Sequence, residues 1–97
     1  MTPEYSDRII AKMHGMNLDQ MEKVVDWFAD GHAAKRATIN KKLTSYGIKH
    51  EIERKTGVYI SNESCVAALI NLGFRAQQVR GTQNYRFNIH IFNGSKP

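Results

Sequence analysis

The organisation of the chain is set by residues 48–69, which read IKHEIERKTGVYISNESCVAAL. The apolar spacing in the first part of this stretch predicts a short helix over 48–56, and Gly57 can end that helix in the left-handed conformation that glycine tolerates. A second helix is expected over 62–72, where Ser61 is one of two residues that can cap the first turn. Because small and apolar residues fill this second helix, we expect it to be central and largely buried.

Further elements are expected on both sides of this stretch. Apolar residues recur at helical spacing and predict three more helices, over 2–14, 18–29 and 33–46. Toward the C-terminus the pattern changes to strict alternation, which predicts a strand over 85–91 paired with a second strand at 74–80. The expected fold is therefore mainly α (α+β), with about five helices followed by a C-terminal β-hairpin.

The helix expected over 33–46 has an apolar side made by Ile39, Leu43 and Tyr46. Gly47 is expected to end it. Four lysines and arginines lie on its other side, so this helix places positive charge directly ahead of the stretch quoted above.

Charge is distributed unevenly along the 97 residues, whose net charge is +5. Residues 1–30 carry three lysines and arginines against six acidic residues, whereas residues 31–97 carry eleven against three, so the two parts have net charges of −3 and +8. A strongly basic segment is typical of proteins that bind a polyanion, most often nucleic acid, and solubility alone is the simpler explanation. We expect one domain over 1–97, made of an acidic helical front (1–30), a basic body (31–92) and a flexible tail (93–97).

A short helix, a glycine-centred turn and a second helix are the layout of a helix-turn-helix. With the expected helix before it and the hairpin after it, the chain over 33–92 resembles the winged helix-turn-helix DNA-binding proteins. The resemblance implies that the helix over 62–72 enters the major groove and that the hairpin acts as a wing. Eleven residues are then expected to contact nucleic acid, with DNA as the expected form. They are Lys35, Arg36, Lys41, Lys42, Lys49, Arg54 and Lys55 at the phosphates, Asn62 and Ser64 nearest the bases, and Arg80 and Arg86 on the wing.

The segment departs from the winged-helix pattern in two positions and in its charge. Glu53 takes a position that is usually held by a small residue, and Glu63 takes one that is usually apolar. The helix over 62–72 has no lysine or arginine, although arginine is the commonest reader of bases. A helical core unit without any DNA contact therefore stays open as the alternative.

The hairpin provides a second polar surface. Its apolar residues alternate as a core face should, and its polar residues either contact nucleic acid or simply face water. The polar set is Arg75, Gln77, Arg80, Arg86, Asn88 and His90.

Several short runs resemble small proteins encoded by bacterial phages, plasmids and integrated elements. The runs are 44–50, 57–62, Ala67-Ala68 and Gly73-Phe74, followed by Asn84 and Phe87-Asn88. The resemblance implies a mobile-element origin, where small proteins are often DNA-binding regulators or inhibitors of host defence that bind a host protein. The expected function is therefore a nucleic-acid-binding regulator, and the alternative is an interaction protein that inhibits a host system.

Catalysis has little support in the sequence, and no enzymatic activity, metal or cofactor is expected. The four histidines, His14, His32, His50 and His90, show no spacing typical of a metal site. A ribonuclease toxin is a third alternative, since His50 lies near Glu51 and Glu53 and could take part in acid–base chemistry. His50 and Glu51 are a poor pair, however, because neighbouring residues on a helix do not face each other.

Cys65 is the single cysteine, which excludes an internal disulfide and fits a reducing cytoplasm. Its apolar neighbours predict a buried thiol. No apolar run approaches the ~20 residues that a membrane-spanning helix needs, so no membrane partner is expected. The acidic front is rich in methionine and aromatic residues, which either pack in the core or form the homodimer interface that palindromic DNA requires.

Overall fold

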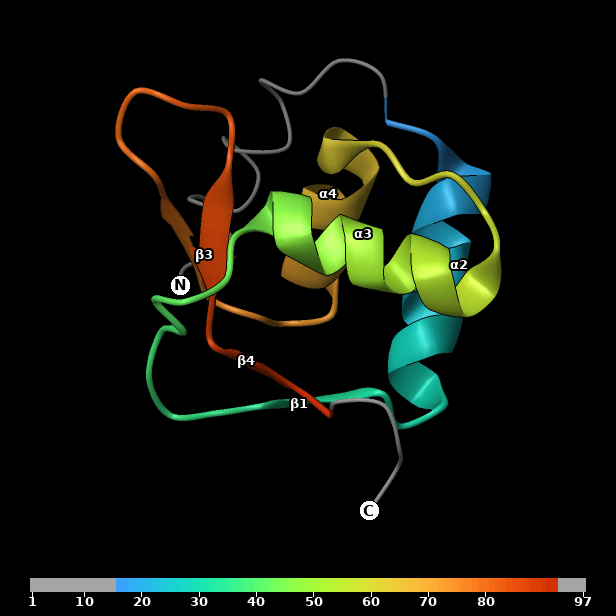
Figure 1. Cartoon of the computed structure of the whole chain (residues 1–97), viewed down its shortest axis with the longest axis horizontal. Coiled ribbons are helices and arrows are strands. Elements are labelled where there is room, and N and C mark those ends of the chain that lie inside the picture. Colours follow the sequence, from blue (N-terminus) through green and yellow to red (C-terminus); the bar gives the residue numbers. More distant parts are fainter. Residues whose placement is uncertain (1–15, 93–97) are drawn as a thin grey trace.

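The computed structural model describes residues 16–92, and helix α4 (Asn62–Asn71) lies at the centre of the fold (Figure 1). Every residue from Ser64 to Ile70 is buried, as the small and apolar composition of the helix predicts. Ser61 caps the helix, because its hydroxyl accepts a hydrogen bond from the Ser64 amide at 3.1 Å. The prediction of a buried helix in this position is confirmed.

Two further helices pack against α4. Helix α2 (Leu18–Ala29) has the predicted range and buries the indole ring of Trp27. Helix α3 (Ser45–Thr56) begins earlier than predicted and buries Ile52. Gly57 ends α3 with φ +74°, and its amide donates to the last turn of the helix, so the predicted glycine stop is confirmed.

The four strands are three residues long each and form two small antiparallel sheets. Strand β1 (Ala33–Lys35) pairs with β4 (Ile89–Ile91), and β2 (Ala76–Gln78) pairs with β3 (Tyr85–Phe87). Asn88 separates β3 from β4, so the two halves of the expected single strand belong to different sheets. The hairpin of β2 and β3 lies on the far side of the molecule from α2 (Figure 1).

The helix expected over 33–46 does not form, and its residues are divided between β1, a loop and the start of α3. The backbone of this segment pairs with the C-terminal strands instead. The amide of Arg36 donates to the carbonyl of Asn88 at 2.9 Å, and the amide of Asn40 donates to the carbonyl of Phe87 at 2.8 Å. These long-range bonds satisfy backbone groups that a local helix would otherwise satisfy, so tertiary pairing overrides the local helical pattern.

The expectation of about five helices followed by a hairpin, in a winged-helix arrangement, is therefore wrong. Over 16–92 the chain forms three helices and four short strands, which is an α+β fold with two small sheets. Gly47 does not end a helix but lies inside α3. The helix expected over 2–14 and the tail over 93–97 lie outside the described residues.

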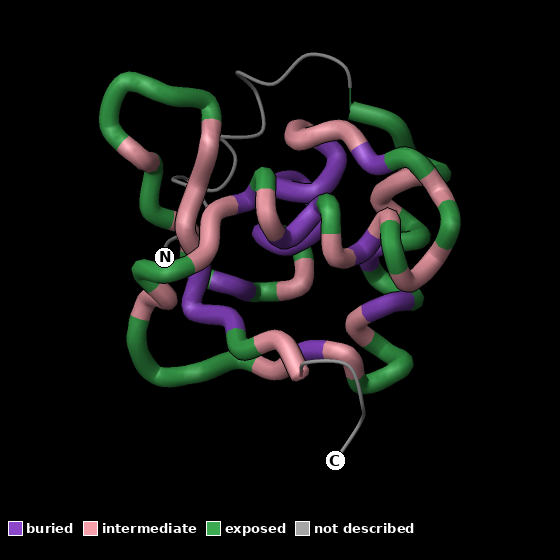
Figure 2. Tube along the Cα trace, viewed as in Figure 1, coloured by how far each residue is buried: buried purple, intermediate pink, exposed green. Residues whose placement is uncertain are grey.

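The core lies between the helices and the two sheets, and Trp27, Phe74 and Phe87 are its largest side chains. Figure 2 shows α4 as the buried centre and the tip of the β2–β3 hairpin as exposed. Cys65 is fully buried, as predicted, and this burial raises the pKa of its thiol to about 12. None of the helices over 16–92 combines the length and the apolar character that crossing a membrane requires.

Candidate nucleic-acid interface

The eleven residues expected at nucleic acid lie in three separate parts of the structure. Two are at the start of α4, three are on α3, and six belong to β1, the loop that follows it and the hairpin. In that order they are Asn62 and Ser64; Lys49, Arg54 and Lys55; and Lys35, Arg36, Lys41, Lys42, Arg80 and Arg86. The surroundings of each part decide whether a phosphate or a base can reach it.

The start of α4 is turned into the protein. Ser64 has no exposed surface, and its hydroxyl accepts hydrogen bonds from the Asn17 amide at 2.9 Å and the Ser61 hydroxyl at 2.8 Å. The Asn62 side-chain amide donates to the carbonyl of Gln83 at 2.9 Å, in the turn of the hairpin. Since the following turns of α4 are buried as well, this helix cannot lie in a major groove as a winged-helix recognition helix does.

Two of the three cations of α3 are paired with carboxylates of the same helix. Lys49 is only 8% exposed, and its ammonium lies 3.1 Å from a carboxylate oxygen of Glu53. The Arg54 guanidinium is hydrogen-bonded to Glu51, which raises the pKa of Arg54 above its ordinary value. A phosphate would have to compete with these carboxylates, and Lys55 is half-buried.

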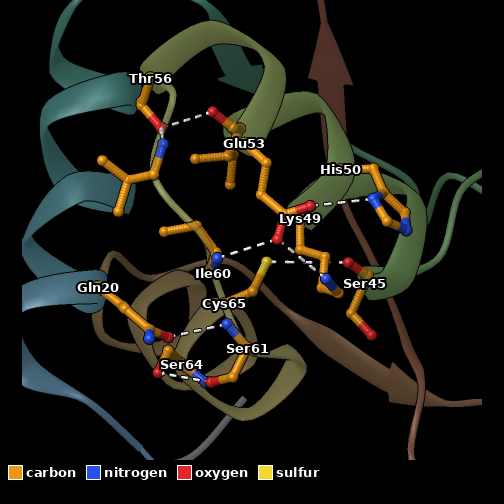
Figure 3. Close-up of polar contacts among 12 residues, drawn as sticks. Gln20, Ser45, Lys49, His50, Glu53, Thr56, Ile60, Ser61, Ser64 and Cys65 are labelled. Carbon is orange, nitrogen blue, oxygen red and sulfur yellow. Dashed lines mark hydrogen bonds and ion pairs between the residues drawn. The ribbon is translucent and has the colours of Figure 1, made fainter.

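Glu53 organises this part of α3 (Figure 3). One of its oxygens accepts from the Lys49 ammonium at 3.1 Å and from the Ile60 amide at 3.0 Å, and the other lies 3.0 Å from Nδ1 of His50. Burial acts to raise the pKa of the Glu53 carboxyl, but the hydrogen bonds and the neighbouring positive charges outweigh it and hold that pKa below its ordinary value. The carboxylate that departs from the winged-helix pattern therefore joins α3 to the turn after it.

Seven lysines and arginines form what we call the basic side: Lys35, Arg36, Lys41, Lys42, Arg75, Arg80 and Arg86. They lie on β1, on the loop after it, and on the β2–β3 hairpin with the residues leading into it; all but Arg86 are exposed. No Asp or Glu occurs in residues 31–50 or 64–92. The acidic residues of the described chain lie on or next to α2, on α3 and at the start of α4.

Asn88 joins the two halves of the basic side. This residue is 7% exposed, and its side chain donates to the carbonyl of Arg36 at 3.0 Å and accepts from the amide of Arg75 at 2.6 Å. The guanidinium of Arg75 donates in turn to the carbonyl of Ala37. Two arginines that are far apart in the sequence are thus held beside each other, which no local pattern indicates.

Lys35 has a contact within the protein as well as an exposed position. Its ammonium lies 5.6 Å from the centre of the Phe74 ring. It also lies so close to Gly73 that a Cβ built there would be 2.9 Å from it. The ammonium is therefore placed at the carbonyl end of α4, which has no basic residue of its own in its last turn.

The hairpin carries the two residues that were expected on a wing. Arg80 is exposed in a turn that is closed by a hydrogen bond from the Val79 amide to the Asn84 carbonyl at 2.9 Å. Arg86 is half-buried opposite Gln77 in the neighbouring strand, and its Nε has no hydrogen-bond partner among the described residues. Arg80 is therefore the more accessible of the two.

Two exposed tyrosines were missed by the sequence reasoning. Tyr46 was expected on an apolar side but is 55% exposed, and Tyr59 is 67% exposed. Because α3 begins at Ser45 and turns Ile48 and Ile52 inward, a residue two positions before Ile48 lies on the opposite side of the helix. The spacing would have shown this if the start of the helix had been assigned correctly.

Within residues 16–92 no group of three or more His, Cys, Asp and Glu side chains is arranged to hold a metal ion. Comparisons with protein-family models, with curated proteins and with solved structures give no match for this chain. Its function is therefore inferred from the charge, exposure and contacts of its own side chains.

Proposed function

We propose that this protein binds nucleic acid without enzymatic activity, and that it does so at the phosphate backbone with its basic side. The observation that carries the proposal is the charge of that side, which has seven lysines and arginines and no Asp or Glu in residues 31–50 or 64–92. Clustered charges of one sign attract phosphates, and binding is favoured further by the release of condensed counterions.

Arg36 and Arg75 give the basic side a fixed centre. Because Asn88 bonds to the backbone of both residues, their guanidinium groups extend from an ordered framework. Arginine has five donors in a planar fork, so Arg75 can bond to the Ala37 carbonyl and still present donors to a phosphate. The exposed lysines of the turn before α3 add two charges next to this centre.

The acidic residues on and next to α2 indicate from which side nucleic acid approaches the protein. Asp19, Glu22 and Asp26 lie on this helix and Asp30 follows it, against the single cation Lys23. These carboxylates repel phosphates, so we expect nucleic acid to approach from the side of the hairpin and the loop. Contacts to phosphates carry no sequence information, and the expected sequence preference is therefore weak.

The proposal is tested by titrating a labelled DNA duplex with the whole chain at several salt concentrations. Replacing both Lys41 and Lys42 by glutamine should weaken binding and flatten its dependence on salt, since each lost phosphate contact removes about 0.9 from the log–log slope. The double variant Lys23→Gln/Lys55→Gln removes the same charge from the helices and should bind like the unchanged protein. Absence of binding at low salt, or an equal loss in both double variants, would overturn the proposal.

A second candidate, an interaction protein that inhibits a host protein, is favoured by the outer face of α2. Leu18 is 81% exposed and Val25 is 39% exposed, on a helix that is otherwise acidic. Apolar side chains surrounded by polar ones are typical of protein-binding surfaces. In a pull-down from nuclease-treated bacterial lysate, the chain should retain one protein that the Leu18→Lys variant does not retain. Recovery of the same proteins by both would contradict this candidate.

A further inference from the structure

We infer that Tyr46 and Tyr59 form a stacking platform for unpaired bases, so that the preferred ligand is a single-stranded nucleic acid. The inference rests on the proposed function and names its substrate class. Among the Phe, Trp and Tyr residues of 16–92, these two alone are exposed; the others are buried or half-buried. A tyrosine ring that faces water offers a flat apolar surface on which any base can stack.

The two rings are gathered at one ammonium group although they come from different segments. The Nζ atom of Lys49 lies 5.6 Å from the centre of the Tyr46 ring, on α3, and 5.1 Å from that of Tyr59, in the turn after Gly57. Cation–π contacts of this kind attract each ring to the cation. Lys49 thus acts as a positioning residue for both tyrosines.

Lys49 is itself held in place by burial and by its ion pair with Glu53. It is 8% exposed, and Glu53 lies 3.1 Å from its ammonium and also accepts from the Ile60 amide at 3.0 Å. The turn that carries Tyr59 is therefore fixed to α3 by the same carboxylate. Rings that are already ordered lose less conformational entropy when a ligand binds, which favours stacking.

Tyr46 has a second restraint and a basic surrounding. The ring of His50 meets it edge to face, with ring centres 4.3 Å apart. Lys41 and Lys42 are exposed just before α3 and belong to the basic side, so the phosphates of a strand that stacks on Tyr46 can reach them. Figure 1 shows that the loop after β1 leads directly into the start of α3.

The charge of this surface distinguishes nucleic acid from a protein ligand. Lys49 is neutralised by Glu53, so the platform itself offers rings, while the exposed Lys41 and Lys42 of the basic side come shortly before it in the chain. Aromatic rings next to a basic track are the combination that binds single strands, where bases stack and phosphates contact lysines. A duplex keeps its bases stacked inside and can use only the cations.

The experiment compares three probes with the whole chain at low salt. They are an oligothymidine strand of about 12 nucleotides, within the usual site sizes of single-strand binding proteins, an abasic strand with the same number of phosphates, and a duplex of equal length. We expect the oligothymidine to bind at least about tenfold more tightly than the abasic strand. Tyr59→Leu and Tyr46→Leu should each lose about tenfold in oligothymidine affinity, whereas Tyr59→Phe and Tyr46→Phe should retain it.

The outcomes separate this inference from the proposed function. If none of the probes binds, both are overturned. If all three bind equally, and the leucine variants bind like the unchanged protein, the proposed function stands and the stacking platform is refuted. If the leucine variants keep their affinity for the oligothymidine but lose a protein that the unchanged chain retains in the lysate pull-down described above, the platform is a protein-binding surface instead. Far-UV circular dichroism of each variant checks that a loss of binding is not a loss of fold.

Discussion

The helical side of the molecule and its basic side are held together in different ways. Helices α2 and α4 are joined by hydrogen bonds between side chains and backbone amides at their N-terminal ends. The Gln20 side chain accepts from the Ser61 amide at 2.8 Å, and the Ser64 hydroxyl accepts from the Asn17 amide at 2.9 Å. Most of the buried apolar residues also belong to the helices. The basic side has strands of only three residues, and one buried side chain, Asn88, bridges its segments. Apolar burial and positive charge are therefore largely separated in this fold.

The largest effect is expected in the helical side, where the core is fully buried. Leu69 has no exposed surface in α4, so Leu69→Ala leaves a cavity and should lower the free energy of unfolding by about 2–5 kcal/mol. Urea unfolding followed by circular dichroism measures this change. Leu18→Ala removes the same atoms from a site that is 81% exposed, and it should change stability by no more than about 0.5 kcal/mol. Equal losses in the two variants would contradict the assignment of Leu69 to the core and of Leu18 to the surface.

An intermediate effect is expected at the bridge within the basic side. Asn88→Ala leaves the Arg36 carbonyl and the Arg75 amide without their partner, and it should cost about 1–3 kcal/mol of stability. Unlike Leu69→Ala, it should also weaken nucleic-acid binding by the folded protein, because the two arginines are then held only by the backbone bonds of residue 88. Asn71→Ala, at the exposed end of α4, is the matched control and should alter neither quantity. A stable Asn88→Ala protein with unchanged affinity would show that the bridge is not needed.

The same division explains which elements could be predicted from the sequence. The helices over 18–29 and 62–71 could be predicted because their apolar spacing and their capping residues lie within one continuous stretch of sequence. The segment 33–35 is also compatible with a helix, but it forms β1 because Ile89–Ile91, far along the chain, offers a pairing edge. Pairing with a distant strand leaves no periodic pattern in residues 33–35 themselves, so strand β1 could not be predicted from the sequence.

The candidate site follows the same rule. The charge of the basic side could be predicted, because the absence of acidic residues in 31–50 and 64–92 is a property of composition. The placement of Arg36 beside Arg75 could not, since it depends on long-range bonds from both residues to the backbone and the side chain of Asn88. Exposure of Tyr46 depended on where α3 begins, and helix boundaries are the least certain feature of a sequence pattern.

A smaller effect, dependent on pH, is expected on α3. Folding lowers the pKa of the Glu53 carboxyl, so its charged form adds stability above the ordinary pKa of 4.5, and this contribution is lost as the pH falls through the lower folded-state pKa. Glu53→Gln keeps an acceptor for the Ile60 amide but removes the ion pairs, and it should cost about 1 kcal/mol or less at neutral pH. The difference should shrink toward zero in acid. Glu51→Gln, whose partner Arg54 is exposed, should show a smaller difference throughout.

The smallest effect is expected at Lys35, where the two sides meet. Its ammonium lies beside Gly73, at the carbonyl end of α4, and supplies the positive charge that the last turn of that helix lacks. Lys35→Gln should therefore lower the free energy of unfolding by about 0.3–1 kcal/mol at low salt. The loss should disappear at high salt, because ions screen the interaction between the charge and the helix dipole.

The control for this variant is Lys42→Gln, which removes the same charge from an exposed turn and should leave the stability unchanged. Lys42→Gln should weaken nucleic-acid binding, and Lys35→Gln should do so as well if Lys35 also contacts phosphates. A Lys35→Gln protein that loses affinity without any salt-dependent loss of stability would assign Lys35 to the basic side alone. In that case the helical side would be independent of the positive charge next to it, and the separation of the two sides would be complete.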